Sequence, residues 1–490
     1  MYINPLTAID FYKADHRNQY PAGTTEVYSN LSARSDKLAN VLGDFDHKVV
    51  FFGLQYFLKS FLIDEWNNNF FSLDVEHVIE KYKRRMFSSL HENCFDFKHI
   101  RKLHELGYLP IKIKALPEGS RVPIGVPLLT IVNTHPEFFW LTNYIETVLS
   151  CYMWKPITSA TTAYEYKRLL TKYAEETGAN LEFINFQAHD FSFRGMSSIY
   201  DAALSGAAHL TSFLGTDTVP AIDLIEDYYF GSEPIGFSVP ATEHSVMCMG
   251  SKQGEFDTFK RLITETYPEG IVSIVSDTWD FWKVITDYLP KLKKTINERN
   301  GKVVIRPDSG DPVKIICGDE SAKAGSPEYM GAVGCLWDTF GGTETEKGFK
   351  RLDQKIGLIY GDSITLDRAK RILELLKLKG FSSDNVVFGV GSYTYQYVTR
   401  DSFGFAVKAT SGVVNGERKS IFKDPATDNG SKKSAKGLLK VNFEDGEYKL
   451  YDNVSESEEM EGSLKVVFEN GIIKNEEEFC NIRDRLYKYL

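Results

Sequence analysis

Cysteine is scarce in this sequence, and the signals for secretion and for membrane insertion are missing. Six cysteines are spread over 490 residues without a Cys-x-x-Cys pair, which excludes a disulfide framework and the usual spacing of a structural zinc site. The start of the chain, MYINPLTAIDFYKADH, lacks the basic and then apolar layout of a signal peptide. The most apolar early stretch, Val49–Ile63, is short and is interrupted by Lys59, so we expect a core helix there and no membrane span. The expectation is a soluble, cytoplasmic protein without a membrane partner.

The sequence also lacks the common nucleotide-binding fingerprints and a basic overall charge. No GxxxxGK[ST] loop occurs, and the segment GVGSYT lacks the third glycine of the dinucleotide motif. His189 and His244 are not spaced as a pair of metal ligands, so a zinc site is not expected. The net charge of −10 argues against a nucleic-acid partner, although it leaves room for a local cationic pocket that binds phosphate.

The chain does contain a recurring pattern of short β-branched runs that stop at charged and small residues. The run Lys302–Ile305, for example, leads directly into Arg306 and Asp308. Further runs of this kind are expected to be strands: Phe183–Phe186, His209–Leu214, Gly236–Val239, Ile271–Val275, Ile356–Tyr360 and Val386–Phe388. Amphipathic stretches lie between them, of which the clearest begins at Thr365 and ends at Gly380. This alternation predicts an α/β fold with a barrel-like parallel βα domain, whose polar strand ends meet at one mouth.

The same pattern divides the chain into three parts. Residues 1–179 are expected to form an N-terminal helical region with a β segment at 109–134 and a long helical region after it. Residues 180–400 are expected to be the barrel-like domain. Residues 401–490 contain hairpin signals at Asn415-Gly416, Asp445-Gly446 and Asn470-Gly471. We therefore expect a C-terminal antiparallel β region that packs with 109–134, so that a mainly antiparallel β and helical domain is built from N- and C-terminal segments.

Several residues at the expected strand ends suit a phosphorylated substrate. Gly361-Asp362 and Gly389–Ser392 follow successive strands, at the place where the backbone N–H groups of barrel loops commonly bind phosphate. Arg306 and Arg400 are suited to bidentate phosphate contact, and Asp362 suits a ribose hydroxyl. Together these residues favour a nucleotide-like substrate.

Two further carboxylates, Asp277 and Asp308, are the best candidates for holding Mg²⁺ through water and phosphate oxygens. Taken singly, each is more commonly a helix cap or a loop residue, and His244 alone would usually be structural. An alternative function for the same two residues is glycoside hydrolysis by a barrel enzyme, with one carboxyl as the acid and the other as the nucleophile. That alternative gives no role to the arginines and the glycine loops. A third possibility is a binding protein that catalyses no reaction. The presence of His244, Asp308 and Arg306 together argues against it.

Longer motifs in the chain support a more specific hypothesis. In order they are DFYKADH with QYP, PEFFWLTNYIET, HDFSFRG, GTDTV, GFSVPATEHS, SIVSDTWD, VVIRPDSGDP, YGD and IFKDP. In these motifs the chain resembles the nicotinamide phosphoribosyltransferase family, a group of type II phosphoribosyltransferases. The resemblance implies transfer of the phosphoribosyl group of phosphoribosyl pyrophosphate to nicotinamide, giving nicotinamide mononucleotide and pyrophosphate in NAD salvage. It also implies Mg²⁺, ATP as an activating co-substrate, and a homodimer with composite active sites.

The resemblance further assigns roles to individual residues. Phe191 and the partner subunit's Tyr12 would sandwich the pyridine ring, and Asp217 would accept a hydrogen bond from the carboxamide. His244 matches the histidine that ATP phosphorylates in this family. The residues implied to bind ribose or phosphate, or to line the pocket, are Arg194, Ser238, Val239, Ser273, Arg306, Asp308, Gly361, Asp362, Gly391, Ser392 and Arg400. The cations implied around pyrophosphate are Arg34, Lys408 and Lys423. The division of roles between Asp277 and Asp308 near the reacting sugar stays open.

One position departs from the family pattern. A run of glycines usually follows the last barrel strand, whereas this chain has GVGSYTY with Ser392 in place of a glycine. A serine N–H still donates if φ is negative, so we expect phosphate binding to be retained. The nearest alternative function is that of a nicotinate phosphoribosyltransferase. Asp217 favours the amide substrate, because a carboxylate repels nicotinate and accepts from an amide N–H.

Overall fold

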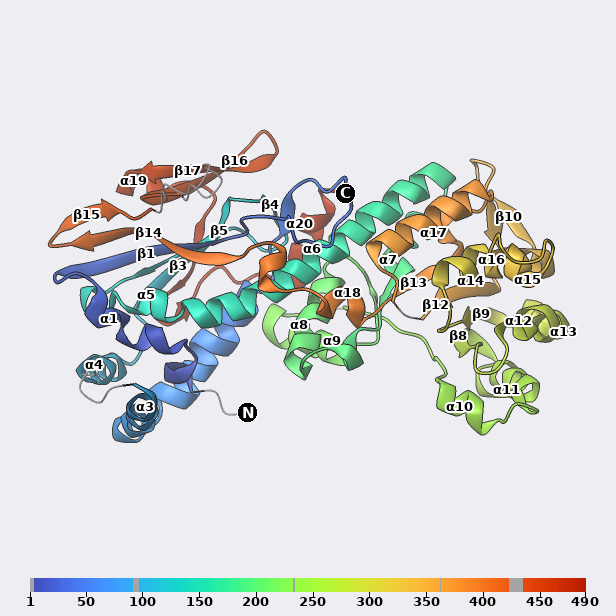
Figure 1. Ribbon diagram of the computed structural model, residues 1–490, viewed down its shortest axis with the longest axis horizontal. Coiled ribbons are helices and arrows are strands. Elements are labelled where there is room, and N and C mark those ends of the chain that lie inside the picture. Colours follow the sequence, from blue (N-terminus) through green and yellow to red (C-terminus); the bar gives the residue numbers. More distant parts are fainter. Residues whose placement is uncertain (1–3, 91–96, 232–233, 362, 423–434) are drawn as a thin grey trace.

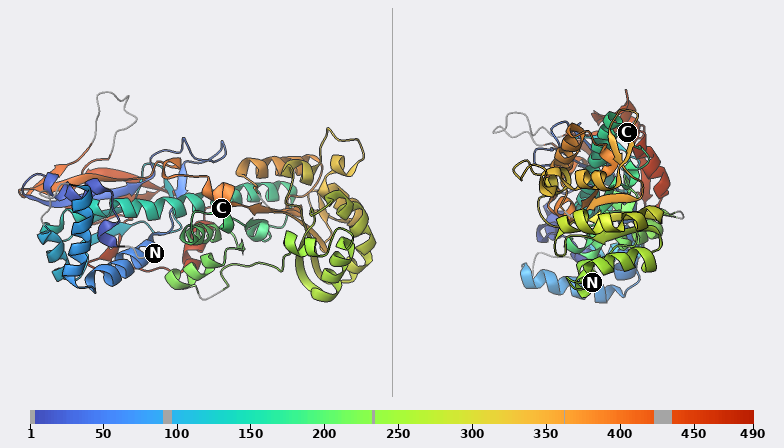
Figure 2. Two further views of the ribbon diagram at one scale, coloured as in Figure 1. Left: turned by 60° about the horizontal axis from the view of Figure 1, so that its bottom comes forward. Right: turned by 90° about the vertical axis from the view of Figure 1, so that its right-hand side faces the viewer.

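The computed structural model describes residues 4–90, 97–231, 234–361, 363–422 and 435–490. Two candidate site residues, Asp362 and Lys423, lie outside these ranges. The molecule is elongated, with a parallel sheet toward one end and a large antiparallel sheet toward the other (Figure 1). The long helix α6 (Glu146–Thr177) runs from one part to the other, and the outline is narrow when viewed along the long axis (Figure 2).

The parallel sheet has the strand order β7-β6-β13-β12-β9-β8, and every pairing in it is parallel. Its strands are β6 (Ala188–Asp190), β7 (Gly215–Thr216), β8 (Glu269–Val275), β9 (Asn300–Arg306), β12 (Ile356–Tyr360) and β13 (Val387–Val390). The segment 236–242 lies against both edge strands, because Phe237 bridges Gly215 and Ala241 bridges Ser273. This segment links the two edges, so the sheet is the barrel-like parallel βα arrangement that the sequence predicts.

Short helices accompany this sheet. They are α7 (Ile184–Gln187), α8 (Ile199–Leu210), α9 (Val219–Tyr229), α10 (His244–Met249), α11 (Glu255–Arg261), α12 (Phe281–Lys283), α13 (Leu289–Glu298), α14 (Pro312–Cys317), α15 (Pro327–Met330), α16 (Ala332–Phe340), α17 (Leu366–Leu378) and α18 (Ser392–Gln396). Helix α17 forms as expected, because the hydroxyl of Thr365 accepts the N–H of Arg368 and Gly380 ends it at φ +76°. It buries Ala369, Ile372, Leu373 and Leu376, and each large apolar side chain contributes about 1.5–3 kcal/mol of stability.

The antiparallel sheet joins segments from both ends of the chain in the order β15-β14-β1-β5-β3-β18-β19. Its strands are β1 (Thr24–Ser32), β3 (Ile111–Ala115), β5 (Pro127–Asn133), β14 (Ala406–Val414), β15 (Glu417–Ser420), β18 (Lys465–Glu469) and β19 (Ile472–Ile473). The smaller sheets pair β2 (Lys48–Val50) with β4 (Arg121–Pro123), β10 (Gly342–Glu344) with β11 (Lys350–Leu352), and β16 (Leu438–Glu444) with β17 (Glu447–Val454). Residues 109–134 thus share a sheet with C-terminal strands.

The three expected hairpin turns are confirmed. Asn415, Asp445 and Asn470 have φ of 53°, 54° and 51°, and each is followed by a glycine that also has positive φ. They connect β14 to β15, β16 to β17 and β18 to β19. Two successive residues with positive φ match the twist of antiparallel strands, which is why Asn-Gly and Asp-Gly are strong hairpin signals.

The remaining helices cover this sheet or connect it to the barrel-like part. They are α1 (His16–Gln19), α2 (Leu54–Phe57), α3 (Val75–Ser89), α4 (Lys98–Leu106), α5 (Leu141–Tyr144), α19 (Glu456–Glu459) and α20 (Phe479–Tyr487). Helix α6 ends at Gly178, whose φ of 66° is the left-handed conformation that terminates helices. The C-terminal helix α20 buries Phe479, Ile482 and Leu486 in a core cluster that it shares with α2, α6, α8 and α9.

Several strand assignments made from the sequence are wrong in detail. Ile184–Gln187 is helix α7, and the strand begins only at Ala188. His209 and Leu210 end helix α8, while Gly236–Val239 makes an isolated bridge instead of a strand. Short apolar runs bury equally well as strand or helix, so periodicity does not separate the two. Strand β1 lies in a region expected to be helical or irregular. Its last six residues are all buried, so it lacks the alternation that identifies a half-buried strand.

Candidate active site

Asp217 lies directly after β7, at the mouth of the parallel sheet. Its Oδ1 lies 2.8 Å from Nε2 of His189 and accepts a 2.6 Å hydrogen bond from the hydroxyl of Ser238. Burial acts to raise the pKa of Asp217, but the contacts of His189 and Ser238 and the charge of Arg306 outweigh it, so the pKa lies below its usual value. Asp217 is therefore ionised at neutral pH. Among the residues that the structure describes, none donates a hydrogen bond to its second oxygen, Oδ2.

A second carboxylate, Asp190, fixes this loop from inside the fold. It is fully buried, and it accepts the N–H of Ser192 at 3.0 Å and the hydroxyls of Thr216 and Thr218 at 3.2 and 2.7 Å. Its own carbonyl accepts the N–H of Asp217 at 3.0 Å. Asp190 therefore ties the loop after β6 to the loop after β7. Asp190 was not among the site residues predicted from the sequence, although its place directly at a strand end was an available signal.

An aromatic ring and a cation lie beside this carboxylate pair. The ring centroids of Phe191 and His189 are 4.6 Å apart, and the guanidinium carbon of Arg306 lies 5.9 Å from the centre of the Phe191 ring. Arg306 is held by a 2.6 Å hydrogen bond to the carbonyl of Thr242. Gly215 is needed next to His189, because a Cβ there would lie 2.7 Å from Nδ1 of the imidazole. The site thus offers an aromatic face with a positive charge near it.

Asp277 is buried, and both of its carboxylate oxygens have partners. Its side chain is 3% exposed, against 49% for His244. Oδ1 lies 3.2 Å from Nε2 of His244, and Oδ2 accepts the backbone N–H of Asp308 at 2.9 Å. Because both oxygens have partners, the geometry favours Asp277 as the group that orients His244 and the Asp308 backbone.

The glycine loops approach the same edge of the sheet. A Cβ on Gly361 would lie 2.2 Å from Oδ1 of Asp308, so glycine is needed where the β12 loop meets this carboxylate. Gly391 precedes helix α18, which Ser392 begins in a helical conformation with negative φ, as phosphate binding by its N–H requires. A Cβ on Gly195 would lie 2.1 Å from Oγ of Ser392, so these two loops pack tightly.

Three further candidates lie on the surrounding segments. Arg194 is exposed on the short turn Phe193–Gly195, and Val239 is half-buried next to Ser238. Ser273 lies on β8, where its hydroxyl is buried and has no hydrogen-bond partner among the described residues. We refer to the connected residues at this edge as the mouth group: His189, Phe191, Asp217, Ser238, His244, Asp277, Arg306 and Asp308.

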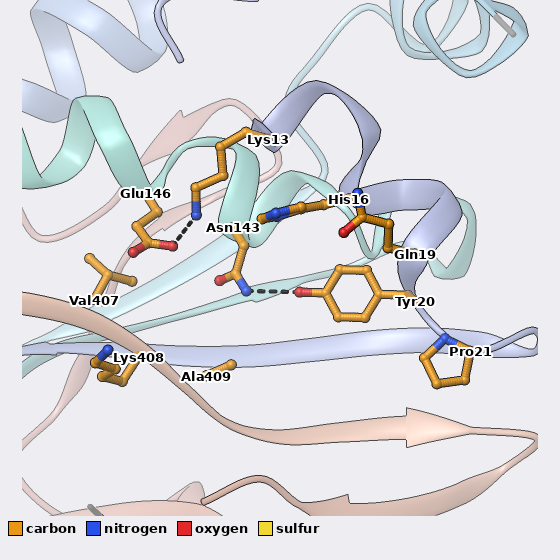
Figure 3. Close-up of a pocket in the computed structure, with 10 residues that line it drawn as sticks. All are labelled: Lys13, His16, Gln19, Tyr20, Pro21, Asn143, Glu146, Val407, Lys408 and Ala409. Carbon is orange, nitrogen blue, oxygen red and sulfur yellow. Dashed lines mark hydrogen bonds and ion pairs between the residues drawn. The ribbon is translucent and has the colours of Figure 1, made fainter. Parts of the chain in front are cut away.

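The other candidates lie with the antiparallel sheet. Tyr12 is 59% exposed and lines a hollow of about 230 Å³ together with Arg400. Lys408, on β14, lines a hollow of about 400 Å³ next to it, in which Lys13 forms an ion pair with Glu146. Figure 3 shows Lys13 reaching toward Glu146 on α6, with Lys408 on the strand beside them.

Arg34 belongs with these residues. Its Nε donates to the carbonyl of Gly404 at 3.0 Å, so it lies against the start of β14, the strand that carries Lys408. We call Tyr12, Arg34, Arg400 and Lys408 the distal group. Within the described ranges, no hydrogen bond or ion pair joins the distal group to the mouth group. The two sheets that carry the groups lie toward opposite ends of the molecule (Figure 1).

In the described part of the chain, no three His, Cys, Asp or Glu side chains come together as a metal site. None of the described helices combines the length and the apolar composition that crossing a membrane requires.

The sequence matches family models over most of its length. Residues 186–472 match the nicotinate phosphoribosyltransferase (NAPRTase) family, and residues 4–113 match the N-terminal domain of nicotinamide phosphoribosyltransferase. The chain therefore belongs to the NAPRTase family of phosphoribosyltransferases. The nicotinamide phosphoribosyltransferase of Acinetobacter baylyi is 60% identical over all of this chain and 98% of its own length. The enzyme of the same name from Mycoplasma pneumoniae is 36% identical over 87% of this chain and 93% of its own.

Solved structures support the fold independently. The nicotinate-nucleotide pyrophosphorylase of Pyrococcus furiosus superposes with a TM-score of 0.56 at 14% identity, covering 100% of this chain and 97% of that one. Human nicotinic acid phosphoribosyltransferase gives 0.53 at 15% identity, covering 98% and 93%. At these identities the likeness concerns the fold alone, and it agrees with the α/β barrel-like class.

Proposed function

We propose that this chain transfers the phosphoribosyl group of phosphoribosyl pyrophosphate to nicotinamide, forming nicotinamide mononucleotide and pyrophosphate in NAD salvage. The observation that carries the proposal is the ionised Asp217, held by His189 and Ser238 with its Oδ2 facing no donor of the described chain. A carboxamide N–H donates to such an oxygen, whereas the carboxylate of nicotinate meets a like charge. The curated relatives at 60% and 36% identity carry the matching name.

The ring of the substrate would stack on Phe191. The guanidinium of Arg306 lies 5.9 Å from that ring, so it is placed to meet the phosphate and ribose of the second substrate next to the stacked pyridine. An aromatic stack contributes about 0.5–1.5 kcal/mol beyond the area it buries. The ring nitrogen then attacks C1′ with its lone pair as the C1′–O bond to pyrophosphate breaks, and no proton has to move.

Charge stabilisation is the chemical task of the remaining mouth residues. As pyrophosphate leaves, C1′ becomes positive, and Asp308 is the carboxylate that we assign to this charge, because it stands just after Arg306 at the end of β9. Gly361 lets the β12 loop approach Asp308 closely. Mg²⁺ bound through substrate phosphates would stabilise the leaving pyrophosphate. Among the mouth residues, Asp308 is also the carboxylate suited to accept hydrogen bonds from the water ligands of Mg²⁺.

ATP stimulation through phosphorylation of His244 belongs to the same proposal. His244 is half exposed, and Asp277 faces its Nε2. With Oδ1 of Asp277 accepting the Nε2–H at 3.2 Å, the lone pair on Nδ1 is the nucleophile that would take the phosphoryl group from ATP. The bond from phosphorus to the β-phosphate oxygen of ATP breaks as the Nδ1–P bond forms, and ADP leaves.

We further propose a homodimer in which the distal group of one subunit completes the mouth group of the other. The support is that both groups consist of residues suited to one substrate pair, although they lie with different sheets of the chain. Tyr12 would then be the second face of the ring stack, and the cations Arg400 and Lys408 would meet the phosphates. Each dimer would contain two such sites.

A product assay tests the proposed function. The purified chain is incubated with phosphoribosyl pyrophosphate, Mg²⁺ and either nicotinamide or nicotinate, with and without ATP, and the mononucleotides are separated and quantified. We expect nicotinamide mononucleotide, little nicotinate mononucleotide, and a higher yield with ATP. An Asp308→Ala variant is the inactive control. Preferential formation of nicotinate mononucleotide would instead establish the nicotinate enzyme, and no product from either base would refute a phosphoribosyltransfer function.

A further inference from the structure

The C-terminal helix α20 lies against the two chain segments that carry Asp217 and Ser238. Arg483, in its middle, donates from Nε and from Nη2 to the carbonyl of Leu210, at 3.0 and 2.8 Å, and from Nη2 to the carbonyl of Ile235 at 3.0 Å. Leu210 is the last residue of α8, and the chain continues from it through β7 to Asp217. Ile235 stands three residues before Ser238. One guanidinium thus holds the starting points of both segments.

The two segments are also paired with each other beyond this point. Phe237 donates its N–H to the carbonyl of Leu214 at 2.7 Å, and its carbonyl accepts the N–H of Thr216 at 3.0 Å. A Cβ on Gly236 would lie 2.9 Å from Cγ2 of Thr216, so Gly236 packs closely against the side chain of Thr216. These contacts connect the Arg483 end of the two segments to the Asp217–Ser238 hydrogen bond.

The position of Arg483 is itself well determined. Its guanidinium lies 4.9 Å from the ring centre of Phe479, one helical turn earlier, and Phe479 is buried against Phe52 and Tyr229. In the described chain Arg483 makes no ion pair, and its hydrogen bonds go to backbone carbonyls. The carbonyl at the end of α8 is one of the acceptors that a helix terminus leaves without an internal partner, and a cation is favourable there.

Neighbouring donors hold the same loop. The carbonyl of Ser212 accepts from Nζ of Lys167 at 2.6 Å and from the hydroxyl of Tyr487 at 3.2 Å, and Nζ of Lys167 lies 3.6 Å from the ring centre of Tyr487. Helix α20 therefore contributes a second contact, one turn after Arg483, to the segment that leads into β7.

We propose that Arg483 is a positioning residue for substrate choice: by holding the carbonyls of Leu210 and Ile235 together, it sets the distance between Asp217 and Ser238 and so the orientation of the carboxylate toward the carboxamide. This inference rests on the proposed function, because it concerns the same amide-selecting carboxylate. A guanidinium spans two carbonyls in a fixed fork, which a lysine ammonium reproduces only as a single charged donor.

The test compares three variants with the wild type in the ratio of kcat/KM for nicotinate to kcat/KM for nicotinamide, and in Tm. Arg483→Met keeps the length of the side chain but removes the donors, and we expect the ratio to rise by about threefold or more, mostly through a higher KM for nicotinamide. Arg483→Lys is expected to lie between Arg483→Met and the wild type, and it remains informative if the methionine variant does not fold.

Arg485→Met is the matched control. Arg485 lies on the same helix but donates to the carbonyl of Glu118 and pairs with Glu477 at 2.7 and 2.9 Å, away from both substrate segments. It should lower Tm and leave the ratio unchanged. An unchanged ratio in both Arg483 variants, or an equal rise in Arg485→Met, would overturn the inference.

The Asp217→Asn variant, assayed in the same way, distinguishes failure of this inference from failure of the proposed function. If it shifts the ratio while the Arg483 variants do not, only this inference fails. If Asp217→Asn itself leaves the ratio unchanged, the role of Asp217 in the proposed function fails, and this inference fails with it.

Discussion

The aspartates at the mouth of the sheet have different hydrogen-bond partners, and we assign them different roles on that basis. Both oxygens of Asp277 are engaged, by His244 and by the backbone of Asp308. Asp217 uses one oxygen for His189 and Ser238. The resemblance assigned Asp217 to the carboxamide, but the sequence left the roles of Asp277 and Asp308 undivided, because hydrogen-bond partners far apart along the chain are not visible in a motif.

The first prediction at this scale concerns Asp217. Replacing it with Asn keeps the shape and removes the charge that repels nicotinate. We expect kcat/KM for nicotinate to rise relative to nicotinamide by about tenfold or more, since each 1.4 kcal/mol changes the ratio tenfold. Steady-state kinetics with both bases measure it. Asp223→Asn, at an exposed position on α9, is the control and should leave the ratio as it is. Equal preference in Asp217→Asn and the wild type would contradict the assignment.

The second prediction concerns His244. In His244→Ala we expect the reaction without ATP to persist, while stimulation by ATP and hydrolysis of ATP disappear, because the histidine is assigned to carry phosphate and not to attack C1′. Asp277→Asn should weaken the stimulation as well, since Asp277 faces Nε2 of His244. Product formation and ADP release are measured together, with His77→Ala on α3 as an exposed control. Complete loss of synthesis without ATP in His244→Ala would place the histidine in the transfer step itself.

At the scale of elements, the sequence predicted best where local chemistry decides the conformation. The hairpin turns at Asn415, Asp445 and Asn470 and the cap of α17 at Thr365 depend on a few adjacent residues, and they are confirmed. Strand β1 was missed because tertiary packing buries nearly all of it, so its sequence shows no alternation. Gly236–Val239 was read as a strand because it is a short apolar run, whereas it makes a single bridge, at Phe237.

The motifs predicted the candidate site better than they predicted its supports. Phe191, Asp217 and Ser238 stand in recognisable segments, and the structure brings the last two within 2.6 Å of each other. Asp190 and Arg483, which hold those segments, were not predicted. Asp190 contacts hydroxyls on the next strand and loop, and Arg483 contacts backbone carbonyls that are far away in the sequence. No motif in the sequence marks a charged side chain that binds such partners.

A third prediction concerns the start of helix α2. Glu118 is buried, and it accepts the N–H groups of Gly53 and Gln55, both at 2.6 Å, and the hydroxyl of Tyr229 at 3.1 Å. Burial raises the pKa of Glu118 from 4.5 to about 7, against the opposing effect of these donors. A raised pKa means that the folded state holds the proton more tightly than the unfolded state. The stability from this group is therefore present below about pH 4.5 and is lost as the pH rises through about 7.

The comparison of wild type with Glu118→Gln isolates this effect. The amide resembles the protonated acid but does not titrate. The free energy of unfolding of the wild type should fall relative to the variant between about pH 4.5 and pH 7, by about 1.4 kcal/mol for each pH unit at most. Denaturant unfolding at several pH values measures the difference, and Glu226→Gln on the exposed side of α9 is the control. A difference that does not change with pH would contradict the raised pKa.

At the scale of the whole molecule, the chain is elongated and carries its two groups of candidate residues with different sheets (Figure 1). The mouth group contains the carboxylates and the aromatic ring, and the distal group contributes Tyr12 and cations. The mouth group alone offers one aromatic ring, Phe191, and one guanidinium, Arg306. In the proposed homodimer, a second copy of the chain would add the ring of Tyr12 and further cations.

Subunit mixing tests this central claim most directly. Tyr12→Ala removes the distal aromatic ring and Asp308→Ala removes the mouth carboxylate, so each homodimer should be nearly inactive with nicotinamide. A mixed dimer has one site with both defects and one site with neither. After subunit exchange at equal concentrations, about half of the dimers are mixed and each has one intact site, so activity should recover to roughly a quarter of the wild-type value. Activity that stays at the level of the separate variants, although mixed dimers are shown to form, would contradict a site shared between subunits.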